Sequence, residues 1–154
     1  MKIEDFDKFQ HFNANENWGN IEQLQWWHVL HLESIREETG WPMKIHCSCE
    51  RKGHSKKSYH PRGCATDFHF ISPIELSVQY DILKTALVGF GSWPFVGLGV
   101  YPEWANPGFH IDGRGYGLRW VRANGIDYYG EENVIQLLSD YEVLKSKVKI
   151  GDSF

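Results

Sequence analysis

Two short segments of the sequence carry residue types that bind metal ions. The first, SYHPRGCATD, contains His60 and Asp67, and the second, FHID, contains His110 and Asp112. Residues two apart on a strand share a face, so His110 and Asp112 are expected to project together. The Pro-Arg-Gly bend after His60 would let His60 and Asp67 face each other. Two imidazoles and a carboxylate suit a zinc ion, with one coordination position left open for water.

A zinc-bound water whose pKa falls to about 7 is a usable nucleophile at neutral pH. A nearby carboxylate must then accept its proton and pass it on. Asp112 is the predicted base because it lies beside His110 on one strand face. Structural interpretations compete with this one: His-x-Asp is common on surface strands, His60 precedes a proline and can simply form a turn, and Asp67 can cap the chain or pair with Arg62.

Several motifs in register resemble one family. The segment SYHPRGCATDF, residues 58–68, resembles the signature of the zinc D-alanyl-D-alanine carboxypeptidase and endolysin peptidase family, which shares its fold with the hedgehog signalling domain. Downstream, GLGVYP (97–102), GFHID (108–112) and RW (119–120) resemble the branch whose second motif is His-x-Asp. The resemblance spans residues 43–122 with the motifs in the same order.

The resemblance implies hydrolysis of amide bonds in peptidoglycan peptides, by carboxypeptidase or endopeptidase action, as in a phage or prophage lysis enzyme. It makes His60, Asp67 and His110 the ligands of a Zn2+ cofactor. Much of the family has an acid three residues before the last His, but Pro107 stands there in this chain. The resemblance therefore also moves the base to Asp112.

Two alternatives to this assignment stay open. Glu103 is a second candidate for the base, and Asp112 can bind the metal while His110 assists catalysis. The missing acid also keeps open a zinc-bound module without activity, or a phage structural protein.

Substrate contacts are expected on both sides of the first motif. The family tends to place an arginine at the end of the preceding strand to hold a substrate carboxylate. Arg51 lies one place off that register, and Arg62 could make the same bidentate contact. Ser58 and Tyr101 are expected to support the substrate. The glycines of residues 97–99 would let an extended peptide approach the backbone.

Periodicity predicts an α+β fold with a mainly antiparallel sheet and flanking helices. A second helix should open at Ser72 and bury Ile74, Val78 and Leu87. The predicted helices cover residues 20–39, from 72 onward and 131–147, and the predicted strands cover 43–49, 64–70, 95–101, 108–114 and 117–122.

Composition limits the remaining possibilities. The chain of 154 residues is expected to form one domain, 1–154, acting as a monomer. A net charge of −4 argues against binding nucleic acid through its phosphates. No apolar run is long enough for a membrane span, and the acidic N-terminal segment is not typical of a secretory signal, which predicts a protein that is cytoplasmic as synthesised.

The cysteines and helix histidines are interpreted as structural. Three cysteines cannot all pair within the chain, which favours a reducing compartment. Cys47 and Cys49 alternate on a predicted strand and lack the paired spacing of structural zinc sites, so small buried residues are the better interpretation. His28 and His31, three apart on a helix, are expected to be packed or exposed on the surface.

Overall fold

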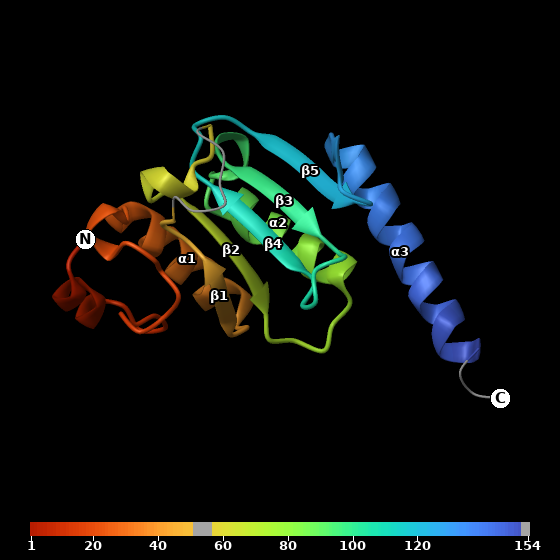
Figure 1. The fold of residues 1–154 in the computed structure, drawn as a ribbon, viewed down its shortest axis with the longest axis horizontal. Coiled ribbons are helices and arrows are strands. Elements are labelled where there is room, and N and C mark those ends of the chain that lie inside the picture. Colours follow the sequence, from red (N-terminus) through yellow and green to blue (C-terminus); the bar gives the residue numbers. More distant parts are fainter. Residues whose placement is uncertain (51–56, 152–154) are drawn as a thin grey trace.

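The computed structural model describes residues 1–50 and 57–151 and confirms the α+β class. One six-stranded sheet is flanked by three α-helices (Figure 1). The helices are α1 (Trp26–Thr39), α2 (Leu76–Gly89) and α3 (Glu131–Gly151), with short 3-10 helices η1 (Ile3–Lys8), η2 (Ile21–Gln23), η3 (His60–Arg62) and η4 (Trp93–Phe95). The strands are β1 (Met43–Cys47), β2 (Ala65–Phe70), β3 (Gly97–Tyr101), β4 (Gly108–Asp112), β5 (Leu118–Ala123) and β6 (Ile126–Tyr129).

The strand order is β1-β2-β4-β3-β5-β6. Neighbouring strands run antiparallel except β3 and β5, which are parallel. The strands β4 and β5 are consecutive in the chain and joined by a glycine-rich turn, but they do not pair with each other. Instead, β5 pairs with β3, on the side of β3 opposite β4. This order places β4 between β2 and β3, so the two segments with metal-binding residue types lie on adjacent strands.

The two faces of the sheet differ in chemistry. Side chains that alternate toward α1 and α2 are apolar and fully buried, among them Phe68, Phe109 and Ile111. The opposite face, called the open face because a cavity lined by His46, Asp67 and Trp104 lies against it, carries Asp67 and His69 from β2 and the buried polar residues His110 and Asp112 of β4. Figure 1 shows α2 behind the sheet and α3 running from β6 away to the C-terminus. The buried apolar side chains therefore pack the sheet against the helices.

Two helix boundaries differ from the predicted ones. The predicted first helix is interrupted, because Asn20 caps only η2 through its side chain and α1 begins at Trp26. It ends as expected at Gly40, whose φ of +68° suits glycine. Of the described residues, none forms a helix long and apolar enough to cross a membrane.

The predicted buried face of the second helix is confirmed only in its later part. Ile74 precedes the helix and is 38% exposed, and Val78 is 44% exposed. Leu87 is buried as predicted, together with Leu76, Tyr80 and Leu83. The helix begins at Leu76, after the proline, and this start sets the face that packs on the sheet.

Candidate metal centre

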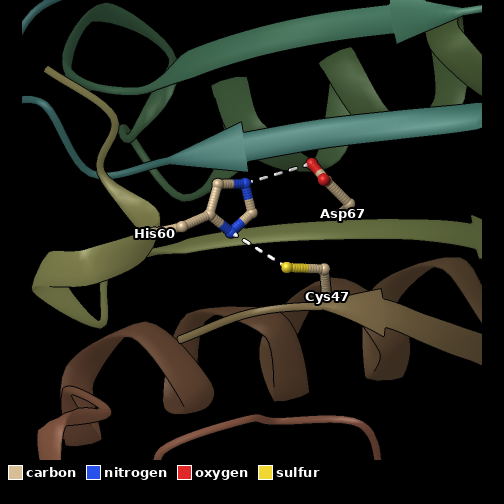
Figure 2. A group of neighbouring side chains, drawn as sticks. All are labelled: Cys47, His60 and Asp67. Atoms are coloured by element: carbon tan, nitrogen blue, oxygen red, sulfur yellow. Dashed lines mark hydrogen bonds and ion pairs between the residues drawn. The ribbon is translucent and has the colours of Figure 1, made fainter. Parts of the chain in front are cut away.

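Three side-chain donor atoms converge on the open face of the sheet. The Nδ1 atom of His110 lies 2.7 Å from Oδ1 of Asp67 and 3.2 Å from Nε2 of His60. The same Asp67 oxygen lies 3.4 Å from His60 Nε2. Asp67 and His110 are direct cross-strand partners on β2 and β4, and His60 enters from η3. Figure 2 shows the imidazole of His60 turned toward Asp67.

These separations can be compared with the spacing of the ligands around a tetrahedral zinc ion. With zinc–ligand bonds of about 2.0–2.2 Å, the edge between two ligands of a tetrahedron is about 3.3 Å. The separations of 3.2 and 3.4 Å are close to that value, whereas 2.7 Å is a hydrogen-bond distance. The three residues could therefore hold a metal ion once the side chains of Asp67 and His110 move slightly apart.

His60 is held in place by the backbone carbonyl of Ser48, the residue directly after β1. Its Nδ1 donates to the Ser48 carbonyl oxygen at 2.6 Å, which leaves the Nε2 lone pair directed at Asp67 and His110. Ser58 Oγ accepts from the His60 backbone N–H at 3.3 Å. This arrangement is the outer-shell support that fixes the tautomer of a metal-binding histidine.

Ser48 is in turn tied to α1 through buried side chains. Its Oγ donates to the Ala65 carbonyl at 2.9 Å and lies 2.9 Å from Thr66 Oγ1. Thr66 Oγ1 lies 2.8 Å from Nε2 of His28, which is 1% exposed. His28 was expected to be either packed or exposed on the surface, and it is packed, which connects α1 to the chain segment beside His60.

Asp112 and Arg114 form a second layer behind His110. The Nε2 of His110 donates to Asp112 Oδ2 at 2.9 Å. Arg114 donates to both carboxylate oxygens of Asp112, at 2.7 and 2.5 Å. Asp112 is 0% exposed. Its carboxylate is therefore enclosed by two donors and positions His110, in the arrangement typical of a carboxylate–histidine–metal triad.

A second donor set includes a cysteine. Donor atoms of Cys47, His60 and Asp67 all lie within 4.8 Å of one another, so this cluster could also hold a metal ion. Its sulfur lies 3.7 Å from Nδ1 of His60, on the opposite side of the ring from Asp67 (Figure 2). That nitrogen already donates to the Ser48 carbonyl. Burial, aided by the charge of Asp67, raises the pKa of Cys47 to about 12. Metals bind the thiolate, so a metal ion held by Cys47 would have to displace the proton of this thiol.

The metal-free centre holds a charged imidazole between two carboxylates. Burial opposes the charge on His110, but the hydrogen bonds to Asp112 and Asp67 outweigh it and raise its pKa to about 9. Burial likewise opposes the charge of Asp112, yet Arg114 and His110 hold its pKa at about 2. Burial opposes ionisation of Asp67 as well, and hydrogen bonds to the two histidines keep its pKa well below its usual range. A metal ion would replace the proton on Nδ1 of His110.

The stability of the metal-free protein is expected to peak near pH 6.5. His110 has a folded-state pKa of about 9 against an ordinary 6.5, so its contribution is complete below pH 6.5 and is lost as the pH rises through 9. This loss is on the order of 3 kcal/mol. Burial lowers the pKa of His28 to about 3 and that of His31 to about 4, so stability also falls below pH 6.5 as the unfolded chain takes up protons. Urea unfolding in the presence of a chelator, from pH 5 to 9.5, measures how the free energy of unfolding falls on the acid side and on the alkaline side.

A matched variant separates the alkaline loss of stability from the acid loss. His110→Gln should remove the alkaline loss of stability and leave the acid loss unchanged. A wild-type free energy of unfolding that stays flat between pH 6.5 and 9 would contradict the charged state of His110.

The remaining predicted site residues occupy different places. Arg62 stacks on the ring of Tyr59, 4.7 Å from its centroid. Tyr101 stacks on Trp104 at 4.2 Å, on the open face of the sheet. Glu103 points away, because both of its carboxylate oxygens accept from the backbone N–H of Asn124. Arg51 lies outside the described residues.

The glycines of β3 do not leave a channel for substrate. An added Cβ at Gly97 would lie 2.4 Å from Arg114 Nε, and one at Gly99 would lie 2.3 Å from the Trp120 ring. The expectation that a peptide approaches this backbone is therefore wrong. These glycines admit the side chains of Arg114 and Trp120, which lie across the strand.

Sequence reasoning missed Arg114, Ser48 and the approach of Cys47 to His60. Arg114 lies two residues after Asp112, a separation that could have suggested an ion pair. No comparable signal exists for Ser48, which contributes a backbone carbonyl. The finding about Cys47 depends on the pairing of β1 with β2, which sets Cys47 opposite Asp67.

The fold and this centre define an α+β domain with a candidate metal site of imidazole and carboxylate donors. Comparisons with protein-family models, with curated proteins and with solved structures find no match.

Proposed function

We propose that the protein is a zinc-dependent peptidase that hydrolyses amide bonds in the peptide part of peptidoglycan. The observation that supports this most is the convergence of His60, Asp67 and His110 within 3.4 Å of one another on an open sheet face. Three protein donors leave a position for water, the arrangement typical of catalytic zinc. The resemblance of the two motifs to zinc cell-wall peptidases supplies the substrate class.

The residues of this chain would have the following roles. Bound zinc would supply a polarising cation and a water of lowered pKa. His60, Asp67 and His110 would hold it, with the Ser48 carbonyl fixing the tautomer of His60. Asp112 would orient His110 and stabilise it as a ligand.

This assignment changes the predicted role of Asp112. An enclosed carboxylate that already accepts from His110 and Arg114 is poorly placed to take a proton from water. Glu103 is engaged by Asn124. His46 lines the cavity beside Asp67 and is the side chain to which we assign proton transfer.

A second function keeps the metal but not the catalysis. Neither predicted base faces the three donor atoms, and this observation favours a zinc-bound binding module or phage structural domain. In that case the centre would hold the ends of β2 and β4 together.

Digestion of purified peptidoglycan separates these functions. The zinc-loaded protein should release new amino groups and shift muropeptide masses by one water per bond cut. A chelator should stop the reaction, and added zinc should restore it. Bound zinc without any change in the muropeptides would support the module and reject the peptidase.

A further inference from the structure

A chain of buried hydrogen bonds runs from helix α1 to the residue that holds His60. His28 Nε2 lies 2.8 Å from Thr66 Oγ1, and Thr66 Oγ1 lies 2.9 Å from Ser48 Oγ. Ser48 Oγ donates to the Ala65 carbonyl oxygen at 2.9 Å. The side chains of His28, Thr66 and Ser48 are at most 1% exposed. Solvent therefore does not compete for these hydrogen bonds.

The protons of this chain have only one arrangement. The single proton of the Ser48 hydroxyl is donated to a carbonyl, which can only accept. Thr66 must therefore donate to Ser48, and His28 must donate to Thr66 through Nε2. Burial lowers the pKa of His28 to about 3, so at neutral pH its imidazole is neutral and its one proton is on Nε2. The direction of each hydrogen bond is thus fixed from His28 to Ser48.

The other ring nitrogen of His28 shows that this chain does not serve stability alone. Nδ1 of His28 is buried and has no hydrogen-bond partner in the part of the protein that the structure describes. An unpaired acceptor in the interior costs free energy, whereas apolar side chains of the same shape would fill the space between α1 and the sheet without that cost. The other effect of the chain is at its far end, on Ser48.

At that end, the backbone carbonyl of Ser48 faces the metal-binding histidine. It accepts from His60 Nδ1 at 2.6 Å and leaves Nε2 of His60 facing the other two donors. Ser48 lies one residue beyond the end of β1, and its hydroxyl ties it to β2 through Ala65 and Thr66. A displacement of this hydroxyl would therefore move the carbonyl that orients the imidazole.

The start of α1 is also fixed relative to His60. The backbone N–H of Gln25, the N-cap of α1, donates to the Gly63 carbonyl at 2.9 Å. Gly63 is the C-cap of η3, the 3-10 helix that begins with His60. An added Cβ at Gly63 would collide with the Gln23 carbonyl oxygen, so the two segments are in close contact. His28, in the first turn of α1, is therefore held firmly relative to the segment that carries His60.

We infer that His28 is a positioning residue of the zinc centre: through Thr66 and Ser48 it fixes the orientation in which His60 binds the metal. This inference rests on the metal centre of the proposed function and not on hydrolysis. Two side chains separate His28 from the Ser48 carbonyl, so His28 acts without touching the metal. Loss of an outer-shell partner weakens metal binding about 10–100-fold, and a more distant partner should act at the lower end of that range.

Zinc affinity and the visible absorption spectrum of the Co2+-substituted protein test the inference. His28→Leu removes the donor, and it should weaken zinc binding about 10-fold and shift the Co2+ bands, because His60 is less firmly oriented. His28→Gln places an amide N–H near the position of Nε2, and it should restore zinc affinity to within about 3-fold of wild type. Chelator competition measures the affinity.

Leu32→Ala is the matched control. Leu32 lies one turn further along α1 and is fully buried, but it has no part in the hydrogen-bond chain. Its loss should lower the stability of the protein to urea and leave zinc affinity and the Co2+ spectrum unchanged.

Ser48→Ala tests the other end of the chain. It keeps the carbonyl that accepts from His60 and removes only the hydroxyl. It should weaken zinc binding as His28→Leu does, and the double variant should lose little more affinity than either single variant. If His28→Leu does not fold, Thr66→Val compared with Thr66→Ser gives the same contrast at the middle of the chain.

Two results would overturn the role of His28. One is zinc affinity within about 2-fold of wild type in both His28→Leu and Ser48→Ala, well short of an outer-shell effect. The other is an equal loss of affinity in Leu32→Ala, which would make the effect one of stability. Failure of the peptidase gives a different pattern, in which the wild type binds zinc and leaves peptidoglycan uncut while the His28 variants still differ in affinity.

Discussion

Replacing Asp67 with alanine is expected to abolish zinc binding and hydrolysis together. Asp67 is the anionic member of the donor set, and its carboxylate oxygen contacts both His60 and His110. Without Asp67, the two imidazoles would provide neither the negative charge of its carboxylate nor the third bond to zinc. Bound zinc should fall from about one per chain to below about 0.1 after dialysis, and the rate by at least about 10³-fold, more than an outer-shell change costs. Metal analysis and release of amino groups from peptidoglycan measure the two effects.

Two control variants sharpen this result. Asp127→Asn removes a carboxylate that pairs with Arg122 at the surface, and it should leave zinc binding unchanged. Cys47→Ala distinguishes the two donor sets: zinc affinity should stay within about 3-fold if the imidazole of His110 is the third ligand. Stoichiometric zinc in Asp67→Ala would contradict both sets, because each contains Asp67.

Strand alternation accounts for what the sequence could predict of this centre. A period of two places Asp67 and His69 on one face of β2, and His110 and Asp112 on one face of β4. The same pattern buries Phe68 on the other face. Once the two strands pair, Asp67 lies directly across from His110. The α+β class follows from this local periodicity, whereas the proximity of Asp67 and His110 also requires the pairing of β2 with β4.

Long-range pairing accounts for what the sequence could not predict. The parallel pairing of β3 with β5 depends on contacts between distant segments, so no local pattern predicts it. The half-exposed strand β6 (Ile126–Tyr129) has no alternating pattern and was missed. In the centre itself, enclosure by Arg114 changes the interpretation of Asp112. No spacing rule shows that a carboxylate is enclosed.

The exchange Asp112→Asn distinguishes a positioning role from that of a base. If Asp112 positions His110, losing its charge should weaken zinc binding about 10–100-fold, because the imidazole becomes a poorer and less fixed ligand. The rate at saturating zinc should then stay within about 10-fold of wild type. If Asp112 is the base, zinc affinity should change little while kcat falls about 10²–10⁴-fold. Chelator competition measures the affinity, and turnover at saturating zinc measures kcat.

Arg114→Gln provides the matched variant for this test. Arg114 donates to both oxygens of Asp112, so its loss should weaken zinc binding in the same direction. The double variant with Asp112→Asn should cost less than the sum of the single changes, since the two residues act on His110 through one ion pair. Additive losses would mean that Arg114 serves the centre independently of Asp112. A kcat effect confined to Asp112→Asn would restore Asp112 as the proton acceptor and leave His46 without that role.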